Sequence, residues 1–164
     1  MINKKLQNAL NGQINEEIFS AYLYLSMAAY FQSLNLNGFA AWMKAQAKEE
    51  MSHAMKFFGF IDEMEGRVTL KAVQEPQKEW KSPLDAFSAA RQHERHISGC
   101  INDLYRLAQA ENCYPMQIML QEFIKEQVEE EATAAAIVHQ LGQIQDSQQG
   151  LWWIDRELGA RKAD

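Results

Sequence analysis

Apolar residues recur at intervals of three and four along four long segments of the chain, and this periodicity constrains the fold more than any other feature. Positions three and four apart share one face of an α-helix, so each segment is predicted to form a helix with an apolar stripe. None of the three prolines, Pro76, Pro83 and Pro115, lies in the interior of these segments. The pattern predicts helices at about 3–34, 39–65, 83–111 and 115–142, with a short fifth helix near 147–159.

The lengths of the connections indicate how these helices are arranged. Short turns join the first helix to the second and the third to the fourth, and short turns make neighbours antiparallel. The connection near residues 66–82 is long. A helix of about 28 residues measures about 42 Å, and about 15 extended residues reach about 50 Å, so this connection can make the second and third helices parallel. We predict an all-α fold in one domain, 1–164: a four-helix bundle over about 3–143 with one long crossover, and a short fifth C-terminal helix at about 147–159.

Polar residues interrupt every apolar stripe near the middle of its helix. They are Glu17 in the first helix, Glu50 and His53 in the second, Glu94 in the third, and Gln127 and Glu130 in the fourth. Since all lie near helix centres, we expect them at one level of the bundle. An unpaired buried carboxylate costs several kcal/mol, so packing alone does not explain four of them.

The spacing of these polar groups is repeated along the chain. In the first half, 33 residues separate the lone glutamate from the pair and three separate the members of the pair, and the second half repeats both intervals. Two similar hairpins would therefore bring their polar groups to a pseudo-twofold centre. Four carboxylates balance two divalent cations, and with one imidazole they suit iron or manganese, whereas zinc more often has Cys or more His. A buried polar network without metal is the alternative.

Composition excludes several classes of partner. The formal net charge of −6 argues against nucleic acid and anionic membranes as partners. The two cysteines, Cys100 and Cys113, fit neither a disulfide framework nor a Cys-x-x-Cys metal spacing.

The N-terminal stretch MINKKLQNALNGQ does not resemble a signal peptide, and no apolar run approaches the roughly 20 residues that span a bilayer. We expect a cytoplasmic protein.

Four stretches around the polar groups resemble the heme-free prokaryotic ferritins, and the resemblance covers nearly the whole chain. They are INEEIFSAYLYLSMA around Glu17, AKEEMSHAMKFF around Glu50 and His53, HE at Glu94, and KEQVEEE around Glu130. The resemblance implies a ferritin-like bundle and a homo-oligomeric shell of twenty-four subunits. It also implies ferroxidase activity, in which O2 or H2O2 oxidises Fe(II) at a di-iron centre in each subunit, and storage of the Fe(III) as a ferric oxyhydroxide mineral.

The resemblance further implies a role for each polar residue. Glu17, Glu50 and His53 would bind one iron. Glu50 would bridge to a second iron, which Glu94 and Glu130 would also bind.

Further positions match the surroundings of the family's iron centre. Gln127 would lie close to the second iron, and Tyr24 matches the family's tyrosine beside the centre. The positions that match the family's third iron site are Glu49, Glu126, Glu129 and Glu130. Near Glu122 the family often has an aromatic residue, commonly Trp, so an electron-donor role is not transferred to this position.

Two related families fit less well. Bacterioferritin binds heme through a methionine near the bridging glutamate, where this chain has Met51, but it also carries a second Glu-x-x-His that is absent here, so no heme is expected. Rubrerythrin-like peroxidases usually need four cysteines for an additional iron site. Two other functions stay open, namely a di-iron oxidase or peroxidase without storage, and a metal-free helical interaction protein.

The remaining histidines and the tail tryptophans receive only general expectations. His93, His96 and His139 fit no ligand spacing with the polar residues, so we assign them to the surface. Trp152 and Trp153 belong either to contacts between subunits or to the core of the domain.

Overall fold

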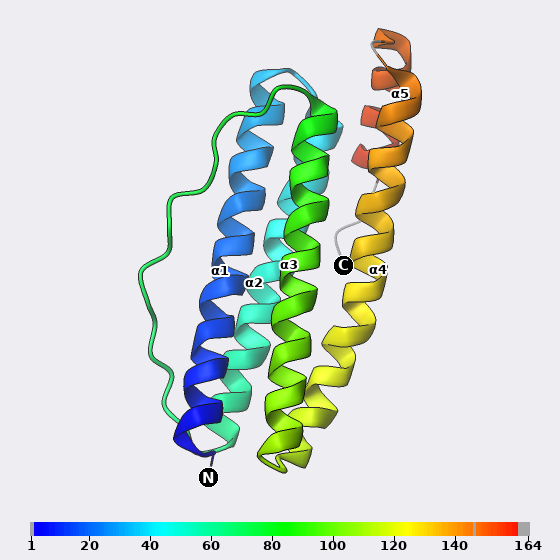
Figure 1. Ribbon diagram of the computed structural model, residues 1–164. Coiled ribbons are helices and arrows are strands. Elements are labelled where there is room, and N and C mark those ends of the chain that lie inside the picture. The colour runs from blue at the N-terminus through cyan, green and yellow to red at the C-terminus, as the bar shows by residue number, and fades with distance from the viewer. Residues whose placement is uncertain (1, 146, 161–164) are drawn as a thin grey trace.

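The computed structural model describes residues 2–145 and 147–160, which form five helices and no strand. The helices are α1 (Lys4–Ser33), α2 (Asn37–Glu63), α3 (Pro83–Ala110), α4 (Tyr114–Ile144) and α5 (Gln148–Gly159). Every boundary lies within two residues of the predicted one. The first four helices lie side by side as a bundle, and α5 lies at the end where α4 finishes (Figure 1). The predicted all-α fold is therefore confirmed.

The long connection between α2 and α3 runs along the outer side of α1 for the length of the bundle (Figure 1). Several hydrogen bonds attach it there. For example, Asn11 Nδ2 donates to the carbonyl of Arg67 at 3.1 Å, and Ser26 Oγ donates to that of Gln77 at 2.6 Å. Because the crossover returns the chain to the starting end of α2, helices α2 and α3 are parallel. This arrangement is the one that the length of the connection predicted.

Helix ends are formed by local hydrogen bonds. Ser82 caps α3 by accepting a hydrogen bond from the backbone N–H of Asp85 at 3.1 Å, and Pro83 occupies the first helical position, as predicted. Two residues beyond the last residue of α1, α2 and α3, the chain adopts a positive φ, at Asn35, Glu65 and Asn112 respectively. After each of these the next backbone N–H bonds back to a carbonyl five residues earlier, which satisfies the last turn of the helix.

Helix α5 caps the start of α2 from a distance in sequence. Asp155 Oδ1 accepts hydrogen bonds from the backbone N–H groups of Gly38 at 2.8 Å and Phe39 at 3.0 Å. The residue preceding α2, Leu36, has no side chain that could accept these bonds. A Cβ at Gly38 would lie 1.7 Å from the carbonyl oxygen of Asp155, so only glycine allows this approach.

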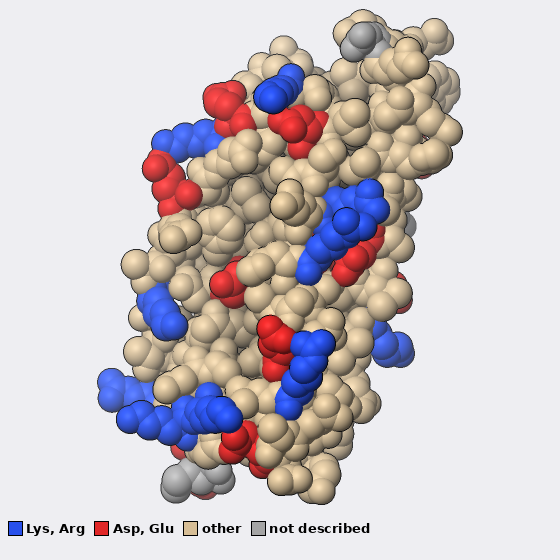
Figure 2. All heavy atoms as spheres, viewed as in Figure 1, with Lys and Arg blue, Asp and Glu red and all other residues tan. Residues whose placement is uncertain are grey.

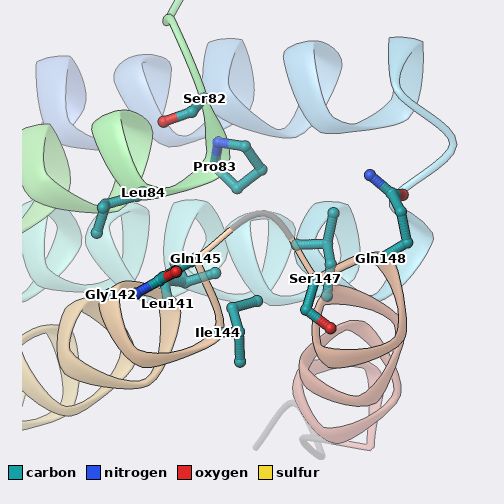
Figure 3. A pocket seen from close by; sticks show the side chains of 10 residues that line it. Ser82, Pro83, Leu84, Leu141, Gly142, Ile144, Gln145, Ser147 and Gln148 are labelled. Atoms are coloured by element: carbon teal, nitrogen blue, oxygen red, sulfur yellow. The ribbon is translucent and has the colours of Figure 1, made fainter.

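A pocket of about 380 Å³ opens between the start of α3 and the α4–α5 turn. Figure 3 shows Ser82, Pro83 and Leu84 on one side of it and Leu141 and Ile144 on the other. Leu141 lies fourteen residues beyond Gln127 in α4, a distance of about 21 Å along the helix. This pocket is therefore remote from the polar level of the bundle.

The apolar core is divided into two clusters that lie toward opposite ends of the bundle. One includes Phe31, Phe39 and Phe87, and the other includes Leu10, Phe57 and Ile101. The predicted polar positions fall between the two clusters in every helix. The expected single level of polar groups is thus present, with apolar packing above and below it.

The molecular surface is mixed in character. On the face in Figure 2, acidic and basic side chains lie near one another in several places, and basic side chains gather at the lower left. None of the described helices has an apolar stretch long enough to cross a bilayer.

Trp152 and Trp153 are 51% and 59% exposed, so they do not belong to the core of the domain.

Candidate metal centre

The polar level of the bundle is formed by one glutamate from each of three helices and by their polar neighbours. Glu17, Glu50 and Glu94 are 1%, 3% and 2% exposed, respectively. His53 and Gln127 are also buried. Glu130, which the sequence places on the apolar stripe of α4, is half-buried, so the prediction of four fully buried carboxylates is wrong for this residue.

The half of the centre on α1 and α2 brings three potential ligands together. Glu17, Glu50 and His53 each offer a ligand atom within 4.8 Å of the other two, and all three side chains are buried. His53 Nδ1 lies 3.3 Å from Glu50 Oε2. The i, i+3 spacing that places these two residues on one face of α2 was visible in the sequence.

Glu17 is only partly satisfied by hydrogen bonds. Its Oε1 accepts a bond from Gln13 Nε2 at 2.7 Å, while its Oε2 is buried and has no hydrogen-bond partner. Burial raises the pKa of the Glu17 carboxyl well above its usual value, and the charge of Glu50 raises it further. A buried carboxylate oxygen without a donor is costly, and a cation beside it would remove that cost.

Burial and neighbouring negative charges also disfavour the ionised form of Glu50, which lies at the centre of the cluster. Burial raises the pKa of the Glu50 carboxyl well above its usual value, and the charges of Glu94 and Glu130 add to this effect. The negative charge of Glu50 therefore interacts with both halves of the bundle.

The half on α3 and α4 is satisfied by protein donors. Tyr24 Oη donates to Glu94 Oε1, and Gln127 Nε2 donates to Glu94 Oε2 at 3.1 Å. Burial raises the pKa of the Glu94 carboxyl, but these two hydrogen bonds lower it. Burial and the charge of Glu94 raise the pKa of Tyr24 well above its usual value, so its hydroxyl stays protonated as a donor.

Glu130 lies at the edge of the centre. Gln46 Nε2, from α2, donates to Glu130 Oε2 at 3.0 Å. The charge of Glu130 raises the pKa of both Glu50 and Tyr24, so this carboxylate faces the centre although it is half-buried. It can approach a bound cation from the more accessible side.

The positions assigned to a third iron site differ in their surroundings. Glu126 Oε2 lies 3.3 Å from His53 Nε2, and Lys56 Nζ donates to Glu126 Oε1 at 3.2 Å. The charge of Glu49, which is half-buried, also raises the pKa of Glu50. Glu129 is exposed on α4. Glu126 and Glu49 therefore border the candidate metal centre, while a role for Glu129 stays a prediction.

Sequence interpretation missed some of the residues that support the centre. Gln13 and Gln46 each lie four residues before a buried glutamate, at a spacing that places them on the same helix face, but neither was assigned a role.

The assignment of His93 to the surface is wrong. Its ring is largely covered, because it lies edge-on to Phe19 and Tyr24 and its Nε2 is 2.7 Å from Ser20 Oγ. Burial lowers the pKa of His93 to about 4, and the neighbouring His96 lowers it as well. His96 and His139 are exposed, as expected.

The arrangement as a whole suits two hard or borderline divalent cations. Carboxylate oxygens from Glu17, Glu50, Glu94 and Glu130 and one nitrogen from His53 are the donors available. Oxygen-rich sites with few imidazoles are typical of iron and manganese. The partnerless oxygen of Glu17 and the raised pKa values of the three buried carboxyls are what binding of a cation would relieve.

Comparisons with known proteins agree with this geometry. The model of one protein family, the Ferritin-like domain, matches residues 7–144. A bacterial non-heme ferritin of Bacteroides fragilis is 42% identical over 161 residues, which cover 98% of this chain and 100% of that protein. The solved structure of an open pore ferritin from the hyperthermophilic archaeon Archaeoglobus fulgidus has a TM-score of 0.98 and 48% identity, and the match covers 99% of this chain and 100% of that one.

A form of the Archaeoglobus fulgidus ferritin that was engineered to be closed matches equally well, with a TM-score of 0.98 and 47% identity over 100% of both chains. The similarity therefore includes the crossover and the fifth helix as well as the four helices of the bundle. The chain belongs to the ferritin-like family.

Proposed function

We propose that this protein is an iron-storage ferritin with ferroxidase activity. It binds two Fe(II) ions per subunit within the helix bundle, oxidises them with O2 or H2O2, and passes the Fe(III) to a ferric oxyhydroxide mineral inside a shell of identical subunits. The observation that carries this proposal is the buried cluster of Glu17, Glu50 and His53, whose ligand atoms lie within 4.8 Å of one another in the centre of a ferritin-like bundle.

Iron is the substrate of the reaction, and the protein's side chains bind and position it. Glu17, Glu50 and His53 hold the first iron, and Glu50 together with Glu94 and Glu130 holds the second. A bridging role suits Glu50 because its charge interacts with both halves of the centre. Anionic oxygen ligands stabilise Fe(III) more than Fe(II) because they respond to the higher charge, and two irons in one site can supply two electrons to one oxidant molecule.

The surrounding packing controls access to this site. The two apolar clusters above and below exclude bulk water from the buried carboxylates.

Glu130 and Gln127 belong to the half of the centre that binds metal more weakly. Glu130 already accepts a hydrogen bond from Gln46, and Gln127 already donates one to Glu94. We infer that oxidised iron leaves through this half, toward a third iron site bordered by Glu49, Glu126, Glu129 and Glu130.

Assembly into a shell of twenty-four subunits is part of the proposal. Large apolar side chains are exposed on α1, α2 and α5, which is a common feature of subunit contacts. They are Tyr22, Leu25, Met51, Met55, Phe58, Trp152 and Trp153. We expect the shell to work in the cytoplasm, without heme and without a nucleic-acid or membrane partner.

Aerobic Fe(II) loading with simultaneous measurement of particle mass tests the storage function. We expect a particle of about twenty-four chains that takes up many more irons per chain than the binding sites can hold. A particle with the mass of a monomer or dimer, which oxidises Fe(II) but retains no mineral, would indicate a di-iron oxidase without storage.

Anaerobic titration with Fe(II) tests the metal centre independently of storage. Saturable binding close to two ions per chain is expected, and it should weaken in a Glu17→Ala variant. If binding is not saturable, the polar level is a metal-free network and the proposed function fails.

A further inference from the structure

A second group of metal-ligating side chains lies outside the bundle interior, between α1 and α3. Glu16 Oε2 is 2.9 Å from His96 Nε2, and Cys100 Sγ is 3.6 Å from the same nitrogen. One ligand atom from each of the three residues lies within 4.8 Å of the other two. Glu16 immediately precedes Glu17 in α1, and successive helical residues point about 100° apart, so the two clusters lie on different sides of this helix.

The geometry points to a second metal site, formed by Glu16, His96 and Cys100, that takes a borderline-soft divalent ion such as Zn²⁺. His96 and Cys100 are four residues apart, which places both on one face of α3, and Glu16 completes the set from the neighbouring helix. Thiolate, imidazole and carboxylate are the three ligand types of protein zinc sites. Three protein ligands leave the fourth tetrahedral position to water.

The ligands are accessible to an ion from solution. The side chain of His96 is 56% exposed and that of Glu16 is 40% exposed. A pocket of about 370 Å³, lined by both of these residues and by His93, opens beside them. The existing contact between Glu16 and His96 joins two exposed side chains. Such a contact contributes little to stability, so a metal ion can displace it readily.

The thiol distinguishes this site chemically from the candidate metal centre inside the bundle, called the carboxylate centre below. Glu17, Glu50 and His53 provide only oxygen and nitrogen donors, whereas thiolate favours zinc and other softer ions. Burial raises the pKa of the Cys100 thiol to about 11, and the charges of Glu16 and Glu17 add to this effect. The thiol therefore holds its proton near neutral pH. Formation of the sulfur–metal bond releases that proton to solvent.

Anaerobic Co²⁺ titration of the assembled full-length protein tests the site, because cobalt bound to thiolate gives a near-ultraviolet charge-transfer band that carboxylate and imidazole sites do not. We expect a band that saturates at one Co²⁺ per chain and disappears when Zn²⁺ is added. Cys100→Ser should abolish the band without slowing Fe(II) oxidation.

Matched variants complete the experiment. Cys113→Ser should keep the band, because Cys113 belongs to none of the metal-ligating groups among the described residues. His53→Ala should keep it as well, since that change affects only the carboxylate centre. Glu16→Gln and His96→Gln change exposed positions that tolerate substitution, and each should weaken Co²⁺ binding by about tenfold or more.

Two results would overturn the proposal. One is the absence of a thiolate–cobalt band at saturating Co²⁺ in the wild-type protein. The other is a band that survives in Cys100→Ser or that Glu16→Gln and His96→Gln leave at full affinity. Neither result depends on whether the protein stores iron, so the proposed function and this site are tested separately.

Discussion

The two helical hairpins contribute differently to the centre, although their polar residues have the same spacing. In the α1–α2 hairpin, Glu17, Glu50 and His53 lie together, and one carboxylate oxygen of Glu17 is buried without a donor. In the α3–α4 hairpin, both oxygens of Glu94 accept hydrogen bonds from protein groups. The first hairpin thus keeps ligand atoms available for a cation. The carboxylate of the second is stabilised without a cation, by Gln127 of its own hairpin and by Tyr24 of the first.

Under the proposed function, this difference would allow one site both to bind iron and to release it. A half with poorly satisfied carboxylates gains most from a cation and should bind it tightly. A half whose carboxylates already have hydrogen-bond donors gains less, because a cation must compete with those donors. Variants that remove this asymmetry or measure it test the comparison.

Loss of a ligand from the tight half should have the largest effect. We expect His53→Ala to slow the initial phase of Fe(II) oxidation by about 100-fold, since a loss at or near a metal ligand typically costs 10–100-fold. Stopped-flow absorbance of Fe(III) formation measures this rate. His139→Ala is the matched control, because His139 is exposed on α4. Equal rates for the two variants would remove His53 from the site.

The pH dependence of the metal-free protein should reflect the buried carboxyls. Burial raises the pKa of Glu17 above the usual value of about 4.5. The folded state therefore binds more protons than the unfolded state between that value and the raised pKa, and stability falls as pH rises through this window.

Thermal denaturation between pH 4 and pH 8 in the presence of a chelator measures this dependence. Glu17→Gln should lose less stability with rising pH than the wild-type protein does, and Glu122→Gln, which changes an exposed glutamate, should behave like the wild type. Parallel curves for wild type and Glu17→Gln would contradict the prediction.

A change that makes the second hairpin resemble the first, with a poorly satisfied carboxylate, should destabilise the metal-free protein. Gln127→Glu removes the amide that donates to Glu94 and places a second carboxylate beside it. We expect a loss of about 2 kcal/mol in the free energy of unfolding of the metal-free protein, and tighter binding of the second Fe(II). Chemical denaturation and anaerobic titration measure the two effects. Unchanged stability would mean that the amide of Gln127 does not stabilise Glu94.

Removal of the hydroxyl of Tyr24 should have a smaller effect. Tyr24→Phe deletes the donor to Glu94 Oε1 while leaving the ring in the core. A hydrogen bond to a charged group contributes about 1.5–3 kcal/mol. Because the ring keeps its packing, we expect a loss at the lower end of this range, about 1.5 kcal/mol. Tyr22→Phe, at a tyrosine that is 48% exposed on the same helix, should be neutral in the same denaturation experiment.

The smallest effect is expected at Glu129. Because this residue is exposed, Glu129→Gln should change the free energy of unfolding by less than about 0.5 kcal/mol. It should also leave the initial oxidation rate unchanged, whereas Glu126→Gln should alter it through the contact of Glu126 with His53. A slower initial oxidation rate in Glu129→Gln would contradict this prediction and would assign Glu129 a role in the first oxidation step.

The sequence was sufficient to place the helices and most of the polar level. Helical periodicity and the residues that interrupt it are local properties of the sequence, so together they predicted the bounds of all five helices to within two residues. The same argument placed Glu17, Glu50, Glu94 and Gln127 inside the bundle. Ser82 and Pro83 marked the start of α3 because capping involves only neighbouring residues.

Contacts between helices depended on the tertiary structure. Periodicity determines the direction in which a side chain points from its own helix, but neither the rotation nor the offset of one helix against another. For this reason the half-burial of Glu130, the covering of His93 and the capping of α2 by Asp155 were not predicted. The cluster of Glu16, His96 and Cys100 likewise exists only because packing brings α1 beside α3.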